Sequence, residues 1–416
     1  MSLEFGTIGV DWQEGINFPR LRKQRLSKAQ AAMKKHGIAA CVLTRQENIR
    51  YTTSTAAPMI LPQVRYALVF AEHEPIIYEL GESLPFNKAN CPWIKPENWR
   101  CSYSWFYGYA GPEATRAGAK NWANAILQDL KEKGLDKEKL GIDAVDEASM
   151  QALTEVGIET VDIKPAIMEA RCTKTKDEVN CMRMAIAIAG AAIASVMQTI
   201  QPGTIGLIRE CDVAAEATRA ILKAGADIWS PVTGIISGQK TFDVCHIEST
   251  SRIIEVGDIL YVRACMASFS MYSTCYYRSF IVGRKPNQKE RDFYKRLYDR
   301  VYSVIGAIKP GATTADAAKH FLPASTWGYD KEECLTFRAV GHGIGLTNQE
   351  APIISRIHSF NYPQLFETGM VIAVEDGEGE LGYGGFRLEE MVLVTDKGTE
   401  VLTPWPAEEV IPLAVL

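Results

Sequence analysis

The sequence GHGIG at residues 341–345 opens the stretch that decides the fold of this chain, and GFRLEE at residues 385–390 closes it. Between them, Glu375 follows a short apolar run, and Glu389 lies just before another. Glycines on both sides of His342 let the backbone come close to whatever the imidazole contacts. One histidine and two glutamates from separate strand-like segments form a candidate metal or acid–base cluster. Each residue alone also fits a glycine-rich turn or a solvated strand end, so the hypothesis depends on their shared order.

Length and composition allow two or three domains with sizeable cores, because the chain has 416 residues of which 47% are hydrophobic. A net charge of −5 predicts neither a nucleic-acid partner nor a membrane partner. Ten cysteines without a CxxC pair, and a first segment without a secretory pattern, favour reduced thiols in a cytoplasmic protein. The most apolar long stretch, residues 185–200, is short for a bilayer and predicts a buried helix.

The first part of the chain alternates helical and strand-like patterns, which is typical of an α/β domain. Residues 1–18 have no clear period and predict an extended arm. The predicted helices cover residues 21–36, 113–133 and a stretch from Glu147. The predicted strands cover residues 38–43, 65–70, 75–80, 140–142 and 159–163, with another strand start near 48–52.

Between these elements, residues 91–111 are rich in aromatic side chains. These are Trp93, Trp99, Tyr103, Trp105, Phe106, Tyr107 and Tyr109. One interpretation is a packed surface loop. The other is an aromatic wall over a ligand, for which a cation would be well suited.

The second part of the chain begins after a connection at residues 165–177. Helices are predicted at residues 178–200, 205–224, 288–308 and 314–321. Residues 259–266 and 271–282 predict the two strands of a long hairpin. Two halves, each with a helix pair and strands, indicate a duplicated α+β architecture without an internal sequence repeat.

The order His-Gly-x-Gly, a Glu after an apolar strand, and Arg-x-Glu before another strand resembles the pita-bread superfamily, which is peptidase M24-like. This superfamily includes methionine aminopeptidase, Xaa-Pro peptidases, creatinase, ectoine hydrolase and the dimethylsulfoniopropionate lyases. The resemblance implies an α/β N-terminal domain at residues 1–168 and an α+β pita-bread catalytic domain at residues 169–416. It indicates the fold more closely than the reaction, because the superfamily carries several chemistries.

In metal-dependent members, two Asp from the long hairpin, the His of His-Gly-x-Gly and two Glu hold two metal ions. The resemblance places His342, Glu375 and Glu389 at three of these positions. Aligning Arg278-Ser279 with the family's Arg-Thr puts Cys275 at the second Asp position. The first Asp position falls within residues 263–265.

No carboxylate occurs between Asp258 and Glu290, so a small alignment shift does not restore the missing ligands. Hard cations prefer several oxygen ligands, and Arg263 would add a like charge beside them. We therefore expect a degenerate dinuclear site and no metal cofactor. An alternative stays open, since Cys265 and Cys275 could join His342 and a Glu around one zinc ion. Free cysteines are also common as small buried hydrophobic residues.

His246 lies in the segment CHIE at residues 245–248. This segment matches the region that carries the substrate-facing histidine of the peptidases and creatinase. Creatinase likewise lacks the Asp pair and uses that imidazole as the general acid–base of a metal-free C–N hydrolysis. The resemblance implies the same role for His246, against the alternative of a structural histidine.

Several further positions are expected to contact the substrate. Gln349 stands where the peptidases carry a second histidine, which argues against ordinary peptide cleavage. Tyr276 and Tyr277 replace a substrate-contacting Glu of creatinase, which argues against creatine itself. We expect Tyr277, Arg387 and Gln349 to line the site.

Arg65 sits where creatinase places a carboxylate-binding arginine, and residues 48–51 resemble a segment of the dimethylsulfoniopropionate lyases. In creatinase-like dimers this region reaches the active site of the neighbouring subunit. We therefore expect a homodimer in which Arg65 acts in trans on a small-molecule substrate. A surface ion pair is the alternative for this arginine.

Taken together, the sequence favours a metal-independent hydrolase of a C–N bond in a small, carboxylate-bearing nitrogenous metabolite. His246 would be the acid–base, His342 would polarise the scissile group, and Glu375 and Glu389 would hold water or a cationic group. One competing hypothesis is a metal-dependent Xaa-Pro-type peptidase or dimethylsulfoniopropionate-type lyase with altered ligands. Another is a non-catalytic binding protein on the same fold.

Overall fold

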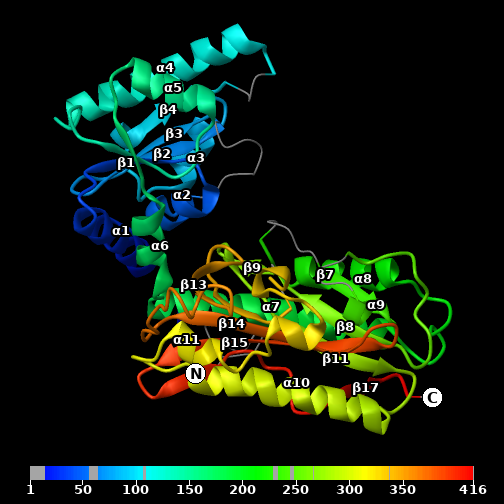
Figure 1. The fold of residues 1–416 in the computed structure, drawn as a ribbon. Helices are drawn as coiled ribbons and strands as arrows, with labels where there is room; N and C mark the ends of the chain where they lie inside the picture. Colours follow the sequence, from blue (N-terminus) through cyan, green and yellow to red (C-terminus); the bar gives the residue numbers. More distant parts are fainter. Residues whose placement is uncertain are drawn as a thin grey trace. The chain divides into compact units, whose positions relative to one another are not determined.

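The computed structural model describes residues 15–55, 64–105, 109–227, 233–243, 248–265, 267–336 and 338–415 (Figure 1). The chain forms two compact units. One is Phe18–Arg171, and the other is Cys172–Leu416 together with the residues up to Asn17. Most of the arm expected at residues 1–18 lies outside the described residues.

The unit Phe18–Arg171 is built on a six-stranded mixed sheet. From edge to edge its strands are β4 (Trp99–Cys101), β3 (Ile76–Glu79), β2 (Tyr66–Phe70), β1 (Ala40–Leu43), β5 (Leu140–Ile142) and β6 (Thr160–Asp162). Its helices are α1 (Phe18–Lys35), α2 (Gln46–Thr53), α3 (Leu84–Asn90), α4 (Pro112–Glu132), α5 (Glu147–Glu155) and α6 (Lys164–Cys172). The predicted α/β domain is confirmed, with most predicted elements in place to within a few residues.

The strand start expected near residues 48–52 is wrong, because this segment lies in helix α2. The carboxylate of Asp143 accepts hydrogen bonds from the backbone N–H groups of Thr44 and Arg45 and from the side chain of Asn48. Asp143 lies far along the chain and stabilises the start of the helix from outside it. A local sequence pattern cannot reveal such a partner.

The aromatic stretch at residues 91–111 is largely structural where it is described. Trp99 and Trp105 are buried, and Trp105 packs against Trp122 with ring centroids 5.1 Å apart. Trp93 is 38% exposed and lies under the guanidinium of Arg22, which is 4.3 Å from its ring centroid. Residues 106–108 lie outside the described part of the chain.

The second unit is built on a nine-stranded sheet. Along its main path the strands are β13 (Glu350–Ile354), β12 (Val340–Gly343), β14 (Val371–Glu380), β15 (Gly384–Thr395), β11 (Tyr277–Val282), β8 (Ile259–Ala264) and β7 (Thr233–Ser237). Two further strands, β16 (Gly398–Val401) and β17 (Ile411–Leu413), pair with β15 and β11. The longest pair, β14 with β15, forms the centre on which the candidate site is built.

The helices of this unit are α7 (Lys176–Thr199), α8 (Glu210–Lys223), α9 (Lys240–Asp243), α10 (Gln288–Ala307) and α11 (Thr314–Ala318). Helix α7 is long and apolar enough to span a membrane by length and composition, and 61% of its most apolar window is buried in the protein. The predicted buried helix at residues 185–200 is therefore confirmed. Helix α7 contacts α8 and β8, whereas α10 contacts β14 and β15.

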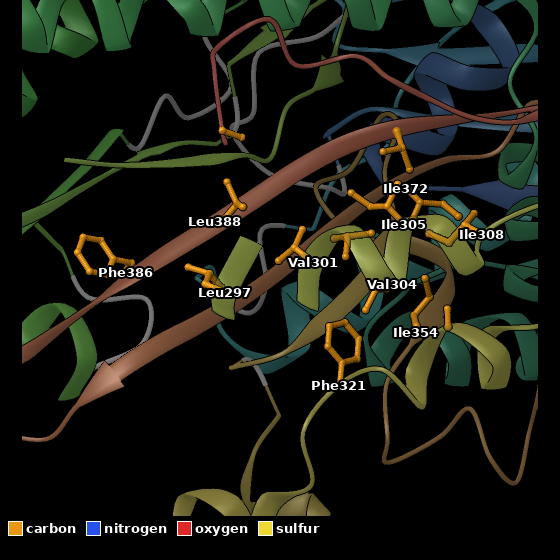
Figure 2. Close-up of a cluster of buried hydrophobic side chains, with 14 of the residues drawn as sticks. Leu297, Val301, Val304, Ile305, Ile308, Phe321, Ile354, Ile372, Phe386 and Leu388 are labelled. Carbon is orange, nitrogen blue, oxygen red and sulfur yellow. The ribbon is translucent and has the colours of Figure 1, made fainter. Parts of the chain in front are cut away.

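The apolar face of α10 packs on one face of the central strands. Figure 2 shows Leu297, Val301 and Ile305 of α10 in one cluster with Ile372 of β14 and Leu388 of β15. Each of these side chains is at most 4% exposed. Burying apolar surface stabilises a fold by about 25 cal/mol per Å². The packing of these side chains therefore stabilises β14 and β15 against α10.

The hairpin expected at residues 259–266 and 271–282 is interrupted. Its tip is a separate two-stranded sheet of β9 (Ser268–Phe269) and β10 (Tyr272–Ser273). Both residues of the turn at 270–271 have positive φ, as a two-residue hairpin turn of type I′ requires. Cys265 and Cys275 lie in the segments that connect this tip to β8 and β11.

Two helices differ from the predicted bounds. Helix α8 begins at Glu210, later than the expected start at residue 205, because Gly206 has φ 83°. The backbone N–H of Arg209 donates to Asp212, which fixes the observed start. Helix α11 ends at Ala318, before the expected residue 321.

Candidate active site

The candidate site lies on one face of the central sheet. Side chains alternate between the two faces of a strand, so directly opposite residues share a face. Glu375 is opposite Glu389, and Tyr277 of β11 is also opposite Glu389. His342 of β12 is opposite Ala373, two residues before Glu375. We call this face, which carries His342, Glu375, Glu389 and Tyr277, the site face.

Glycines allow the strand of His342 to approach its neighbours closely. A Cβ on Gly343 would lie 2.0 Å from the carbonyl oxygen of Ala351, so a side chain there would displace the backbone. A Cβ on Gly345 would lie 2.7 Å from a carboxylate oxygen of Glu350. The glycines of the GHGIG segment are therefore required by packing.

The imidazole of His342 is held in one orientation. Its Nδ1 lies 3.0 Å from the carbonyl oxygen of Gly343, so we place the proton on Nδ1, where it is donated. Nε2 then presents a lone pair 3.7 Å from Oε1 of Glu389. This oxygen is buried and has no hydrogen-bond partner within the described residues. The two atoms face a common point at which a ligand could bind.

Glu375 is already paired with a cation. Nη2 of Arg387 donates to Oε2 of Glu375 at 2.8 Å, and both side chains are buried. Arg387 is opposite Gly377, where a Cβ would lie 3.6 Å from a guanidinium nitrogen. The guanidinium carbon also lies 5.5 Å from the ring centroid of Tyr277. The pair thus neutralises one of the two candidate carboxylates inside the protein.

Two cysteines meet beside the other carboxylate. Sγ of Cys265 lies 3.1 Å from Sγ of Cys275 and 4.0 Å from Oε2 of Glu389. Both cysteines are buried free thiols. Of residues 263–265, where the first Asp ligand was expected, Cys265 is therefore the one that contacts this cluster.

These residues do not fit a pair of hard divalent cations. Such ions need several oxygen ligands with negative charge. Here two thiols stand near Glu389 in place of carboxylates, and Arg387 neutralises Glu375. Arg263, directly opposite Tyr277, is a second guanidinium on this face and is paired with Glu248 at 3.2 Å. His342, Glu375 and Glu389 still offer one ligand atom each within 4.8 Å of one another, whereas the two thiols stand where further oxygen ligands would be needed.

Burial decides the protonation of the cluster. It lowers the pKa of His342, which favours the neutral imidazole. Burial, and then the charge of Glu375, raises the pKa of Glu389 well above its usual range. Burial also raises the pKa of the Cys275 thiol and of the Tyr277 phenol. The ion pair of Glu375 and Arg387 therefore lies beside His342, Glu389, Cys275 and Tyr277, whose pKa shifts all favour the uncharged form.

The predicted site residues are only partly brought together. His342, Glu375, Glu389, Tyr277 and Arg387 share the site face, as described above. The idea that His342 polarises the scissile group needs a proton on Nε2, whereas the Nδ1 contact leaves a lone pair there.

The other predicted residues lie elsewhere or outside the described chain. Gln349 is exposed, and its carbonyl oxygen accepts a hydrogen bond from Thr347. His246 is outside the described residues. Arg65 belongs to the Phe18–Arg171 unit, where its Nε lies 3.1 Å from a carboxylate oxygen of Glu79.

This pairing of Arg65 is buried, so the surface ion pair considered from the sequence is wrong. Its Nη1 and Nη2 have no hydrogen-bond partner within the described residues. Burial lowers the pKa of Arg65. A buried guanidinium with unpaired nitrogens can accept an anionic group without first losing hydrogen bonds.

Sequence reasoning missed the residues that support the His342 loop. Nζ of Lys174 lies 3.2 Å from Oε2 of Glu350, and both side chains are 1% exposed. The other carboxylate oxygen of Glu350 accepts the backbone N–H of Thr347. The only signal was the position of Glu350 shortly after the glycine-rich segment at residues 341–345.

Comparison with known proteins now identifies the family. Residues 180–396 match the model of metallopeptidase family M24, and residues 25–173 match the creatinase/prolidase N-terminal domain. Since the first match alone spans half of the chain, the protein belongs to metallopeptidase family M24. The predicted pita-bread resemblance and the two-part fold class are confirmed.

Individual relatives differ in the activity that their names give. The chain is 25% identical to a Xaa-Pro dipeptidase of Pyrococcus furiosus, over 92% of this chain and 98% of the relative. It is 24% identical to a creatinase of a Bacillus species, over 92% and 90%. It is 25% identical to a dimethylsulfoniopropionate lyase of Roseovarius nubinhibens, over 97% and 89%.

Solved structures support the same fold. A Xaa-Pro dipeptidase from Bacillus anthracis matches with a TM-score of 0.74 at 23% identity, over 94% of this chain and all of that chain. A prolidase from Pyrococcus horikoshii matches with a TM-score of 0.72 at 22% identity, over 93% and 100%. At these identities the likeness shows the fold alone.

Proposed function

We propose that this protein hydrolyses a C–N bond in a small nitrogenous metabolite that carries a carboxylate, without a dinuclear metal centre. The observation that carries the proposal is the buried pair of Glu375 with Arg387 at 2.8 Å. A carboxylate that is committed to a guanidinium is a poor ligand for a hard cation. The nearby thiols of Cys265 and Cys275 support the same conclusion.

The chain's own residues have defined roles in this proposal. The Nε2 lone pair of His342 accepts a hydrogen bond from the attacking water or from an N–H of the substrate. Oε1 of Glu389, which lies 3.7 Å from Nε2, orients the same water. Arg387 and Tyr277 position the substrate beside Glu375, and the exposed Gln349 is a further proposed substrate contact.

His246 is the proposed general acid–base, and this part of the proposal rests on its sequence motif. Its imidazole would take a proton from water and return it to the leaving nitrogen. We expect His246→Asn to lower kcat by about 10²–10⁴-fold with a smaller effect on KM. A variant with wild-type kcat would remove His246 from the mechanism.

The substrate can be sought directly. The purified protein is incubated with a panel of N-substituted amino acids, cyclic and amidino carboxylates and Xaa-Pro dipeptides, with and without a chelator. Mass spectrometry detects the gain of one water and the release of an amine. Chelator-resistant turnover of a non-peptide metabolite is expected. Chelator-sensitive cleavage limited to Xaa-Pro dipeptides would contradict the proposal.

A second candidate is a Xaa-Pro-type dipeptidase with altered ligands. It is favoured by the similarity to the Pyrococcus furiosus Xaa-Pro dipeptidase along 98% of that relative. The same panel separates the two candidates, because a dipeptidase would release free proline from the Xaa-Pro substrates.

We further propose a cytoplasmic homodimer in which Arg65 of one subunit binds the substrate carboxylate in the other subunit's site. Arg65→Ala and His246→Ala homodimers should then both be nearly inactive. After mixing and re-association, about half of the dimers are hybrids with one intact site, so about a quarter of wild-type activity should return. Hybrids that are detected by mass but remain inactive would exclude the role of Arg65 in trans.

A further inference from the structure

A cavity of about 290 Å³ lies within the Phe18–Arg171 unit and is not used by the proposed reaction. Its walls come from α1, from the end of α2 and from the two segments that precede β3 and β4. Pro19, Leu26, Pro75 and Ile94 supply the apolar part of these walls. Ligand pockets usually begin at about 300 Å³, so this cavity suits a small molecule.

One wall carries Trp93, a member of the aromatic stretch at residues 91–111. Its indole Nε1 donates to the carbonyl oxygen of Thr53 at 2.9 Å, which fixes the ring. The guanidinium carbon of Arg22 lies 4.3 Å from the centroid of this ring. A guanidinium that already stacks on a fixed ring loses little freedom when it binds a ligand. The cavity therefore presents a preorganised cationic group.

The charged side chains of the cavity are out of balance. Three cationic residues, Arg22, Lys23 and Lys95, line it together with a single carboxylate, that of Glu74. Nζ of Lys95 pairs with this carboxylate at 3.0 Å. Among the described residues, no carboxylate pairs with Arg22 or Lys23. The cavity therefore combines an excess of positive charge with an apolar wall.

Arg22 is partly removed from water without gaining a counter-charge. Burial, and then the nearby charge of Arg25, lowers the pKa of Arg22. An anion beside the guanidinium would replace the solvation that burial removes. Carboxylate and phosphate oxygens match the N–H donors of an arginine, which can bind two of them at once. Lys23, the next residue of α1, supplies a second positive charge for the same anion.

We propose that Arg22, Lys23 and Trp93 form a binding site for one small anion with carboxylate or phosphate oxygens. Arg22 donates hydrogen bonds to these oxygens, and Lys23 adds a point charge. Trp93 and Ile94 contact the apolar part of the ligand. The site lies within a single unit and does not depend on the reaction proposed above.

A third cation of α1 provides the matched control. Lys34 is exposed, pairs with Glu72 at 3.1 Å and is not part of the cavity wall. Lys34→Gln removes one positive charge from the same helix and should leave anion binding unchanged. Arg22→Gln and Lys23→Gln each remove one positive charge from the cavity. Lys23 is exposed, so its variant keeps the test valid if the change at the partly buried Arg22 prevents folding.

The test uses full-length protein at low ionic strength, titrated in calorimetry with inorganic phosphate, succinate or acetate, and with glycerol as an uncharged control. We expect saturable binding of one anion per chain, with a change in tryptophan fluorescence because the ligand contacts Trp93. Hydrogen bonds to charged groups contribute about 1.5–3 kcal/mol, so Arg22→Gln should bind at least about 10-fold more weakly. A smaller loss is expected in Lys23→Gln. Tighter binding of phosphate or of succinate tells which acidic group the site prefers.

The proposal is overturned if folded wild-type protein binds none of the three anions saturably. It is also overturned if the folded cavity variants bind them as tightly as Lys34→Gln does. Circular dichroism and thermal unfolding verify that each variant is folded. None of these readouts is turnover, so failure of the metabolite screen would count against the proposed reaction and leave the anion site standing.

Discussion

Glu389 and Glu390 are neighbours on β15, yet they face opposite surroundings. Glu390 accepts two hydrogen bonds from Arg278 at 3.0 and 2.9 Å, one from Tyr302 at 3.2 Å and one from Thr403. Glu389 has one oxygen without a hydrogen-bond partner within the described residues. Both glutamates are at most 1% exposed, so burial does not separate them.

The difference follows from the pleat of the strand. Successive side chains point to opposite faces, so Glu390 faces α10 and the apolar cluster of Figure 2, and Glu389 faces His342. A buried carboxylate that is fully paired stabilises the fold, whereas one with a free acceptor is available to a ligand. The comparison therefore separates a structural face of β15 from the face that carries the candidate site.

The largest expected effect comes from breaking the structural pair. Arg278→Ala leaves Glu390 as an uncompensated buried charge, which should lower the free energy of unfolding by about 3–5 kcal/mol. Urea unfolding followed by circular dichroism measures this loss. The control is Arg183→Ala, because Arg183 pairs with a Glu400 side chain that is 45% exposed. That change should cost at most about 1 kcal/mol, and an equal loss in both variants would contradict the assignment.

The same substitution at the two neighbouring glutamates sharpens the comparison. Glu390→Gln weakens the charged hydrogen bonds from Arg278 and should cost about 1.5–3 kcal/mol. Glu389→Gln breaks no hydrogen bond at Oε1, so it should cost less than about 1 kcal/mol. On the substrate identified by the screen, Glu389→Gln should instead lower kcat by at least about 100-fold. Similar unfolding curves for the two variants would remove the distinction between the faces.

A smaller effect is expected at the exposed Gln349. This residue stands where the peptidases carry a second histidine, so Gln349→His restores that histidine. Surface changes are usually within about 0.5 kcal/mol, so stability should stay the same. Xaa-Pro cleavage should not appear, because the ligand set around Glu389 is unchanged. New proline release by this variant would favour the dipeptidase candidate.

The sequence allowed the site face to be predicted in outline. The sequence places His342, Glu375 and Glu389 in or beside strands. Side chains alternate between the two faces of each strand, and in the paired strands these three residues fall on the same face. The loss of the Asp ligands, with Cys275 at the second Asp position and the first position within residues 263–265, was also visible from the sequence. Their contact at 3.1 Å was not, because it depends on the register of β8 with β11.

Other features could not be predicted because they depend on partners distant in sequence. The helix at residues 46–53 starts directly after Thr44 and Arg45, whose backbone N–H groups donate to Asp143. Arg387 pairs with Glu375, which lies on the neighbouring strand and 12 residues earlier in the sequence. The proton position on His342 depends on the carbonyl of Gly343. Local periodicity carries none of this information.

We propose that the site face works without two hard metal ions. Measuring metal content and turnover on the same sample tests this proposal most directly. The protein and Glu389→Gln are incubated with excess Mn²⁺, freed of unbound ion and analysed by elemental mass spectrometry. We expect less than one Mn²⁺ per chain in both proteins, with turnover of the wild type unaffected by a chelator. Two Mn²⁺ per chain that are lost in Glu389→Gln and required for turnover would contradict the claim.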